Sequence, residues 1–493
     1  MALRKLAFSA AALSAARATQ TILTFLALPF LARLLGPAEY GLVALAMSFV
    51  LFTMAFSDAG MGQSLVRTPP ENTVVWSSAF WMIAALSGSL GLLLVAVAWP
   101  AAWVFEEPRL AALVLALAPL PLLQGMLSPA MADLQQREKF NTMALAEIVG
   151  ALAGVALALY IAFSGGGAWA LVTQQLGYWG AKGVILVAST RFRPRFVFRL
   201  AELSDHFRFG RDTAAWGLIN FFARQIDPLV IAKIIGTISL GFYAMAMRLM
   251  SLPAFLVSGP VQSTLYTRMV ALRDDKPALR TLVLIATRAL AAFVFPPMAI
   301  LCVASAAFIE IFLGERWLPT AILFAVLAPT GALQAVVDLN GGLLMAVGRT
   351  DLRLRLTWEF TLLWVIAVPF LAMQGVEAVA IGYSALFLLY LPRTLQLFLR
   401  PIDLSLRDYF GALSVPLVIA CALAAIHVIA GTMLPLSPWG EIALAASEIL
   451  IGYGVSAWVL RGRLTKDLKT ARGLFKPRVP QVVMPDPTGA LQK

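Results

Sequence analysis

Charged residues are scarce in this sequence: Asp, Glu, Lys and Arg make up 13% of its 493 residues, while apolar residues make up 60%. Soluble domains carry about 25% charged and about 45–50% apolar residues. Long apolar stretches recur from end to end, so the lipid bilayer is the natural solvent of this chain. This composition excludes a set of water-soluble domains.

Cysteine and histidine are rarer still. Cys302 and Cys421 lie in apolar segments, cannot form a disulfide framework and are not spaced as metal ligands. His206 and His427 are isolated, and His427 is expected to be a packed, hydrogen-bonded side chain. The sequence therefore has too few suitably placed His and Cys residues for a zinc site or a Ser/His/Asp triad. We expect no catalytic residue, no metal site and no cofactor.

About fourteen membrane spans are predicted, each near or above the 20 residues that cross a core of about 30 Å. Only helices fit, because lipid cannot satisfy backbone polar groups and no period-2 barrel pattern appears. The predicted fold is therefore an all-α polytopic membrane protein. The spans are placed near residues 7–35, 40–66, 74–104, 110–132, 141–163, 168–190, 212–235, 239–267, 281–309, 318–347, 354–374, 377–399, 407–431 and 440–460.

The net charge of +12 follows from the loops and does not indicate nucleic acid as a partner. Cytoplasmic loops of membrane proteins are rich in Lys and Arg. With the N-terminus inside, the outside loops carry only Arg33, Arg109 and Arg316 of the 38 basic residues. Both termini are thus predicted to be cytoplasmic, with a basic, Pro-rich tail over 461–493 that lies near anionic lipid.

An internal repeat divides the chain. LARLLGPAEYGLVALAM (Leu31–Met47) aligns without gaps to IAKIIGTISLGFYAMAM (Ile231–Met247) at an offset of 200 residues, with Gly36 on Gly236 and Gly41 on Gly241. A second match pairs Arg137 and Glu147 with Arg349 and Glu359, ten residues apart in each case. Such parallel repeats build transporters whose substrate path runs between the halves. We predict an N-lobe (1–190, spans 1–6), a basic cytoplasmic connection (191–211), a C-lobe (212–399, spans 7–12) and spans 13–14 outside the repeat (400–460).

Three segments resemble one family. RLLGPAEYG (Arg33–Gly41), QQREKF (Gln135–Phe140) and RQIDPLVIAKIIGTISLGFYAMAMRL (Arg224–Leu249) look like the bacterial polysaccharide exporters of the O-antigen and colanic-acid flippase type. These belong to the multidrug/oligosaccharidyl-lipid/polysaccharide exporter superfamily. The resemblance covers about residues 5–460. It implies two six-helix lobes around a central cavity, with two extra helices, in the bacterial inner membrane.

The resemblance also implies a function. The expected activity is the transfer of an undecaprenyl-diphosphate-linked oligosaccharide from the inner to the outer leaflet by alternating access, for surface or exo-polysaccharide synthesis. The expected partners are that lipid-linked glycan, membrane lipid and other membrane proteins of polysaccharide assembly.

Three arginines inside predicted spans are candidates for the substrate site. An ionisable residue at mid-bilayer costs about 2.5–3.5 kcal/mol and needs a partner or a hydrated cavity. Arg17, Arg224 and Arg248 are predicted to line a cationic cavity for the substrate diphosphate, because guanidinium groups form paired hydrogen bonds with phosphate. Alternatively, Arg224 pairs with Asp227 at i+3. The nearby cations Lys182, Lys233 and Arg288 can snorkel to an interface.

Four further polar residues are candidates for coupling or gating. Asp58 can accept a proton or pair with Arg17, or it can form a helix-break turn beside small residues. Asp227, in the predicted seventh span, is a second acidic candidate. Asp338 and Asn340 stand beside Gly341 and Gly342, where the helix backbone can open.

Two rival functions are considered. A cation-coupled drug antiporter of the same superfamily would favour acidic groups in its cavity, whereas the first span has Arg17 and no acid. A membrane-embedded glycan polymerase or ligase would need a sizeable outside loop, whereas the predicted outside loops have about ten residues or fewer.

Overall fold

The computed structural model describes residues 2–58, 60–69, 71–203, 221–222, 225–434 and 436–475, and every regular element in these ranges is a helix. The all-helical prediction is therefore confirmed. The helices are α1 (Ala2–Phe56), α2 (Met61–Leu65), α3 (Thr73–Val104), α4 (Pro108–Leu117), α5 (Leu120–Gln136), α6 (Phe140–Phe163), α7 (Trp169–Ser189), a helical stretch over 225–234, α9 (Thr237–Met250), α10 (Gly259–Ala271), α11 (Lys276–Val303), α12 (Ser305–Leu313), α13 (Pro319–Val337), α14 (Leu339–Ala346), α15 (Thr350–Ala372), α16 (Val376–Leu399), α17 (Leu406–Met433) and α18 (Pro438–Phe475). Short pieces are the 3₁₀ turns η1 (Leu200–Leu203), η3 (Glu315–Trp317) and η4 (Arg400–Ile402) and the π-helix η2 (Ala254–Ser258).

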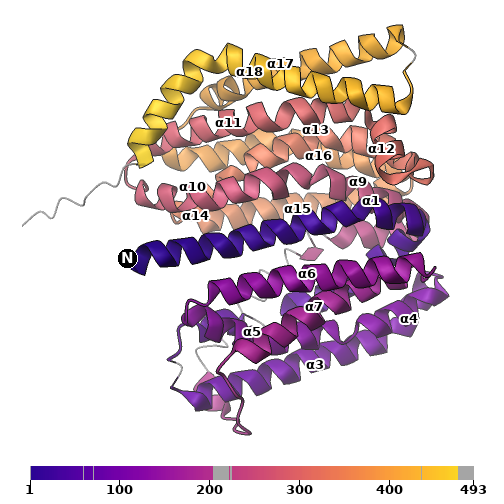
Figure 1. The fold of residues 1–493 in the computed structure, drawn as a ribbon, viewed down its shortest axis with the longest axis vertical. Helices are drawn as coiled ribbons and strands as arrows, with labels where there is room; N and C mark the ends of the chain where they lie inside the picture. Colours follow the sequence, from indigo (N-terminus) through magenta and orange to yellow (C-terminus); the bar gives the residue numbers. More distant parts are fainter. Residues whose placement is uncertain are drawn as a thin grey trace, which may run out of the picture.

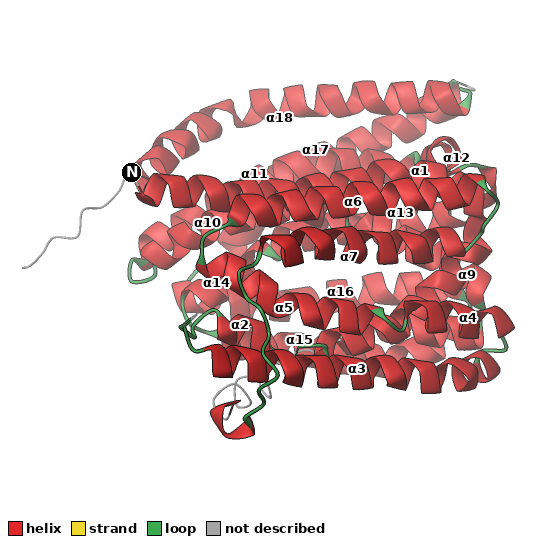
Figure 2. Ribbon diagram, turned by 60° about the horizontal axis from the view of Figure 1, so that its bottom comes forward, coloured by secondary structure: helices red, strands yellow, loops and turns green. Residues whose placement is uncertain are grey.

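The long helices run side by side in two groups (Figure 1). We use N-lobe for α1 to α7 and C-lobe for residues 225–399. The pair α17 and α18 packs on α11, on the face of the C-lobe that is remote from the N-lobe (Figures 1 and 2). The terminal end is the end of the bundle where α1 starts and α18 finishes. The opposite end carries the turns at Gly36 and Gly236 and is called the turn end.

The turn at Gly36 divides α1 into two predicted spans. Gly36 has φ 73° and ψ 173°, which is not helical, and the chain reverses direction there. Residues with a side chain rarely adopt a positive φ, so the reversal requires glycine. Gly236 has φ 111° at the equivalent position before α9. The sequence repeat is therefore also a repeat of backbone conformation.

Eleven helices among the described residues are long and apolar enough to cross a membrane. The first of them holds the predicted spans 1 and 2, which meet at Gly36. The predicted span over 168–190 is the helix α7, whose sequence is less apolar. Most of the predicted span over 212–235 lies outside the described residues. The count of fourteen spans thus stays a prediction.

Several spans are interrupted or extended relative to the prediction. The span over 110–132 is α4 followed by α5, with Pro119 at the break. The span over 318–347 is α13 followed by α14, with the break at Asp338. Helix α18 continues to Phe475, past the predicted span end at 460. An ion pair between Arg288 of α11 and Asp467, together with the packing of Leu474 on the core, holds this extension.

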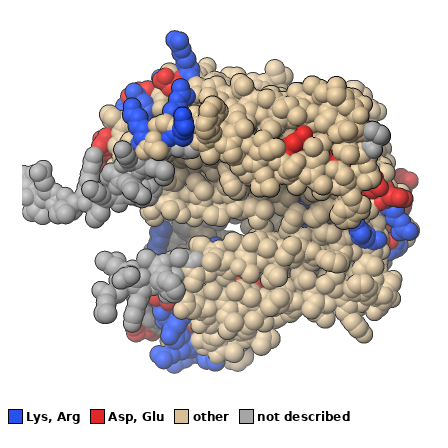
Figure 3. Space-filling model, turned by 45° about the horizontal axis from the view of Figure 1, so that its top comes forward, with Lys and Arg blue, Asp and Glu red and all other residues tan. Residues whose placement is uncertain are grey.

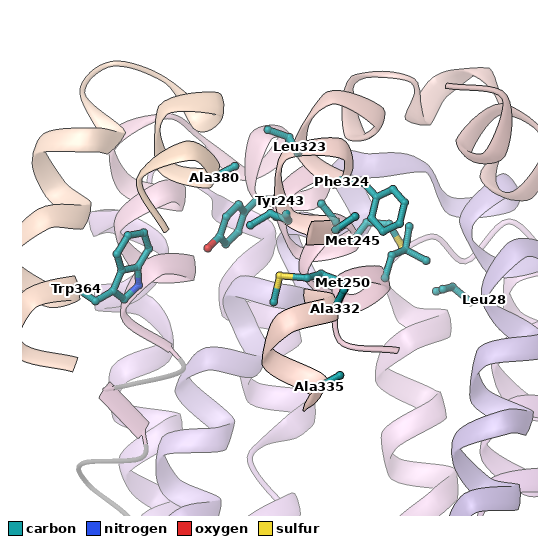
Figure 4. Packing of buried hydrophobic residues seen from close by; sticks show 14 of the residues in the cluster. Leu28, Tyr243, Met245, Met250, Leu323, Phe324, Ala332, Ala335, Trp364 and Ala380 are labelled. Atoms are coloured by element: carbon teal, nitrogen blue, oxygen red, sulfur yellow. The ribbon is translucent and has the colours of Figure 1, made fainter. Parts of the chain in front are cut away.

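The apolar core joins both lobes. Leu28 of α1, Met250 of α9 and Phe324 of α13 belong to one buried cluster, which also reaches Trp364 of α15 (Figure 4). Many large apolar side chains on the outer helices are exposed, including Trp99, Ile366 and Trp458. A water-soluble protein could not expose so many large apolar groups, whereas lipid tails would cover them.

Candidate functional site

The molecule is hollowed between its two lobes (Figure 3). In this view Lys and Arg side chains gather mainly at the terminal end, and some lie inside the hollow near that end. The surface of the long helices is almost free of charge. The space between the lobes is therefore where a polar group could be held away from lipid.

The two lobes meet at the turn end through the repeated glycines. A Cβ atom at Gly41 would overlap the carbonyl oxygen of Thr237 and lie 2.8 Å from the nitrogen of Gly241. A Cβ atom at Gly241 would overlap the carbonyl oxygen of Pro37. The two glycines that the repeat aligns thus face each other, and only glycine allows the backbones of α1 and α9 to come so close.

Arg33 and Lys233, which the repeat aligns, each donate a hydrogen bond to a backbone carbonyl of the opposite lobe at the turn end. Arg33 of the N-lobe donates to the carbonyl oxygen of Ile311 in the C-lobe. Its repeat partner Lys233 of the C-lobe donates to the carbonyl oxygen of Val104 in the N-lobe over 2.7 Å. Trp317 Nε1 also donates to the carbonyl oxygen of Ala32 over 2.9 Å. The lobes are therefore tied together at the turn end in this conformation.

Arg17 is exposed beside a buried carboxylate. Its Nε lies 3.9 Å from Glu147 Oε1 on α6, and 59% of its side chain is exposed. Glu147 also accepts hydrogen bonds from Lys182 Nζ over 2.9 Å and from the Tyr178 hydroxyl over 2.5 Å. Gly150 makes this possible, because any side chain there would press on the carbonyl oxygen of Tyr178 and on Lys182 where α6 and α7 cross. Lys182 is buried in this cluster and does not snorkel.

Arg248 lies on the last turn of α9 and is exposed, with no ion pair to any residue that the structure describes. Arg248 is twelve residues from Gly236 and Arg17 is nineteen from Gly36, so they lie about 18 Å and about 28 Å below the turn end. No described contact joins the two side chains. Arg224 lies outside the described residues, and its role and its pairing with Asp227 stay predictions.

Two of the three acidic candidates in the spans, Asp58 and Asp227, have side-chain hydrogen bonds. Asp58 Oδ1 accepts from the backbone N–H of Gly60 over 3.0 Å, and Oδ2 accepts from the Ser128 hydroxyl over 2.7 Å. These bonds close the turn between α1 and α2 and attach it to α5. Asp227 is buried and accepts from the Tyr243 hydroxyl over 2.7 Å. Roles in coupling or gating stay predictions for both residues.

Asp338 and Asn340 lie where the helix breaks between α13 and α14. The carbonyl oxygen of Asp338 accepts from Gln262 Nε2 over 2.8 Å, a bond from α10. Asn340 is fully buried and donates to the Tyr409 hydroxyl of α17 over 2.9 Å. Asn340 thus links the C-lobe to the additional helix pair, and its predicted gating role stays a prediction.

A second glutamate cluster, which the sequence reading did not assemble, lies in the C-lobe. Glu359 of α15 accepts from the Tyr390 hydroxyl, from Arg393 over 2.8 and 2.9 Å, and from Arg355 Nε over 2.8 Å. Tyr178 and Tyr390 are 212 residues apart, as are Glu147 and Glu359. A search for further matches at this offset would have found the tyrosines.

The model of the family described as "Polysaccharide biosynthesis protein" matches residues 30–322, which is more than half of the chain. The chain belongs to the polysaccharide biosynthesis protein family. The resemblance to the polysaccharide family that the turn motifs indicated is thereby confirmed, and this family member is a multi-pass membrane protein.

Two curated relatives align over most of the length of this polysaccharide biosynthesis protein. One is the teichuronic acid biosynthesis protein TuaB of Bacillus subtilis (strain 168), 27% identical over 381 residues that cover 76% of this chain and 78% of TuaB. Another is the lipopolysaccharide biosynthesis protein WzxC of Escherichia coli (strain K12), 25% identical over 367 residues that cover 73% of each chain.

A solved structure shares the fold of this family member. The lipid II flippase MurJ in an inward closed conformation superposes with a TM-score of 0.74, covering 92% of this chain and 99% of MurJ at 14% identity. The two chains therefore share a fold.

Proposed function

We propose that this protein moves an undecaprenyl-diphosphate-linked oligosaccharide from the cytoplasmic to the outer leaflet of the bacterial inner membrane. The observation that carries the proposal is the exposure of Arg17 and Arg248 on apolar helices of two different lobes. A charge on such a helix is stable only beside a partner or in a hydrated space. A diphosphate between the lobes would supply that partner, because guanidinium forms strong charge-assisted hydrogen bonds with phosphate.

The proposed transport cycle is alternating access. The lobes would rock between the arrangement seen here, with the turn end closed, and one with the turn end open. In this proposal the terminal end faces the cytoplasm, because most of the basic loop residues lie there. Fourteen spans, with both termini cytoplasmic, complete the proposed topology.

The geometry favours this function over the two rivals. Arg17 and Arg248 would repel a cationic drug from the cavity, because their positive charges have no full counter-charge among the described residues. An enzyme would require paired acid and base groups exposed together. Instead, the buried Glu147 and the partly exposed Glu359 are each bound by a tyrosine and by a cation. We therefore propose a transporter and not an enzyme.

Deletion of the gene, followed by separate analysis of the two leaflets, tests this function. Undecaprenyl-linked oligosaccharide should accumulate on the cytoplasmic leaflet, and wild-type protein should clear it. Arg17→Ala and Arg248→Ala should each slow clearance about tenfold or more, since each removes charge-assisted hydrogen bonds of about 1.5–3 kcal/mol.

Lys276→Met is the matched control for the loss of a cation, because Lys276 pairs with Asp403 on the exposed surface. The control should clear the lipid at the wild-type rate with the same amount of protein in the membrane. Normal clearance by both arginine variants would rule out the cationic site.

A further inference from the structure

The two glutamate clusters have the same framework but different cations. In each lobe a glutamate accepts a hydrogen bond from the hydroxyl of a tyrosine that lies 31 residues later. In the C-lobe, Arg355 and Arg393 both donate directly to Glu359. In the N-lobe, Ala181 stands 212 residues before Arg393, and the next residue, Lys182, is the cation that donates to Glu147.

This lysine satisfies Glu147. Lys182 Nζ lies 2.9 Å from Glu147 Oε1, and both side chains are only 6% exposed. The ammonium group also donates to the Tyr178 hydroxyl over 3.1 Å and lies 4.8 Å from the centre of the Trp179 ring. A compact ammonium fits this enclosed space, whereas a guanidinium is a wide planar fork. The carboxylate is therefore neutralised from inside the lobe.

Arg17 is left with most of its charge as a result. Its Nε lies 3.9 Å from Glu147 Oε1, which is beyond hydrogen-bond distance, and 59% of the Arg17 side chain is exposed. Coulomb attraction to a carboxylate that already has a counter-ion at 2.9 Å is largely cancelled. In the C-lobe, by contrast, the guanidinium groups are occupied by Glu359.

We propose that Lys182 is a positioning residue for Arg17: by holding Glu147 it keeps the Arg17 guanidinium available for the diphosphate of the lipid-linked substrate. The inference rests on the proposed function, since Arg17 must bind the diphosphate. Without Lys182, Glu147 would be a buried, uncompensated carboxylate with Arg17 as its nearest cation. A full ion pair would then form between them, because leaving a buried charge unpaired is costly.

Isothermal titration with inorganic pyrophosphate tests this proposal. The purified full-length protein is kept in detergent at low ionic strength. Arg17→Ala should weaken binding. Lys182→Met should weaken it by about tenfold, although Arg17 is still present. The double variant Lys182→Met/Glu147→Gln removes both buried charges and should restore binding to within about twofold of wild type.

The rescue separates positioning from folding. A merely structural role for Lys182 would leave the double variant as weak as the single one, and that result would overturn the proposal, as would unchanged binding by Lys182→Met. If Lys182→Met does not fold, Glu147→Gln alone decides: binding at least as tight as wild type supports the proposal, and binding as weak as Arg17→Ala contradicts it. Should Arg17→Ala bind pyrophosphate normally, the proposed substrate site itself fails. Lys276→Met controls for the loss of net charge.

Discussion

Arg17 and Asp58 show how hydrogen-bond partners decide what a charged side chain can do within an apolar helix. Both are isolated charges in the sequence and both were candidates for the transport site. Asp58 has a partner for each of its oxygens, the Gly60 N–H and the Ser128 hydroxyl. Arg17 has only a distant contact with a carboxylate that Lys182 already neutralises. Charge alone does not separate these cases, but the partners do.

Asp58→Asn should therefore support normal transport. The amide oxygen can still accept from the Gly60 N–H, and the amide nitrogen can donate to the Ser128 hydroxyl, so the turn between α1 and α2 is kept. Clearance of the lipid-linked intermediate from the cytoplasmic leaflet should match wild type at neutral and at acidic pH. Loss of transport by Asp58→Asn at an unchanged protein level would instead assign Asp58 a role in proton coupling.

At the scale of single residues, the sequence predicted that charged side chains in the spans need partners, but it did not predict which residues pair. An arginine and a glutamate inside apolar spans must be compensated, and that much follows from the cost of a charge in lipid. Which residues meet depends on how α1, α6 and α7 are rotated about their axes. Arg17 and Glu147 are far apart in the chain, and the sequence pattern of neither helix gives its rotation.

The element that carries the architecture is the pair formed by α1 and α9. The alignment of Gly36 with Gly236 and of Gly41 with Gly241 predicted a repeated turn, and the positive φ of both turn glycines agrees. That Gly41 and Gly241 face each other could not be predicted, because it requires the relative placement of the lobes. The helix break at Pro119 was likewise absent from the predicted spans, since hydropathy stays high across it, whereas an opening of the backbone beside Asp338 was expected from Gly341 and Gly342.

Gly41→Ala should damage the packing of these helices. The added methyl group would overlap the Thr237 carbonyl oxygen, and overpacking of a close contact costs about 1–3 kcal/mol. The melting temperature of the detergent-solubilised protein should fall, and transport should fall with it because the turn end no longer closes. Gly180→Ala on α7 is the matched control, as a Cβ there meets open space and alanine favours a helix. Equal melting temperatures for both variants would refute the close contact.

The whole molecule combines an apolar exterior, a hollow between two like-built lobes and a closed turn end. An all-helical membrane fold followed from composition alone, because 60% apolar residues leave no other solvent than lipid. The hollow did not follow from composition, since it depends on how far the lobes are separated. An anionic lipid headgroup bound in the hollow would account for the exposed arginines and would agree with the family to which the chain belongs.

The most direct test of the proposed transport is to measure translocation of the lipid-linked glycan in reconstituted vesicles. Purified undecaprenyl-diphosphate-linked oligosaccharide is placed in one leaflet, and its arrival in the other is followed by attack of a membrane-impermeant glycosidase. Thr237→Cys/Glu107→Cys, in a background without Cys302 and Cys421, places two thiols across the turn end, where Thr237 donates to Glu107 Oε1 over 2.6 Å. A short thiol-reactive reagent that contains a disulfide can cross-link them reversibly.

The account predicts that wild-type protein moves the lipid-linked glycan well above the rate of protein-free vesicles, that the cross-linked protein does not, and that a reductant which cleaves the cross-link restores movement. Movement that is no faster than in empty vesicles, or that continues undiminished through the cross-linked protein, would contradict it.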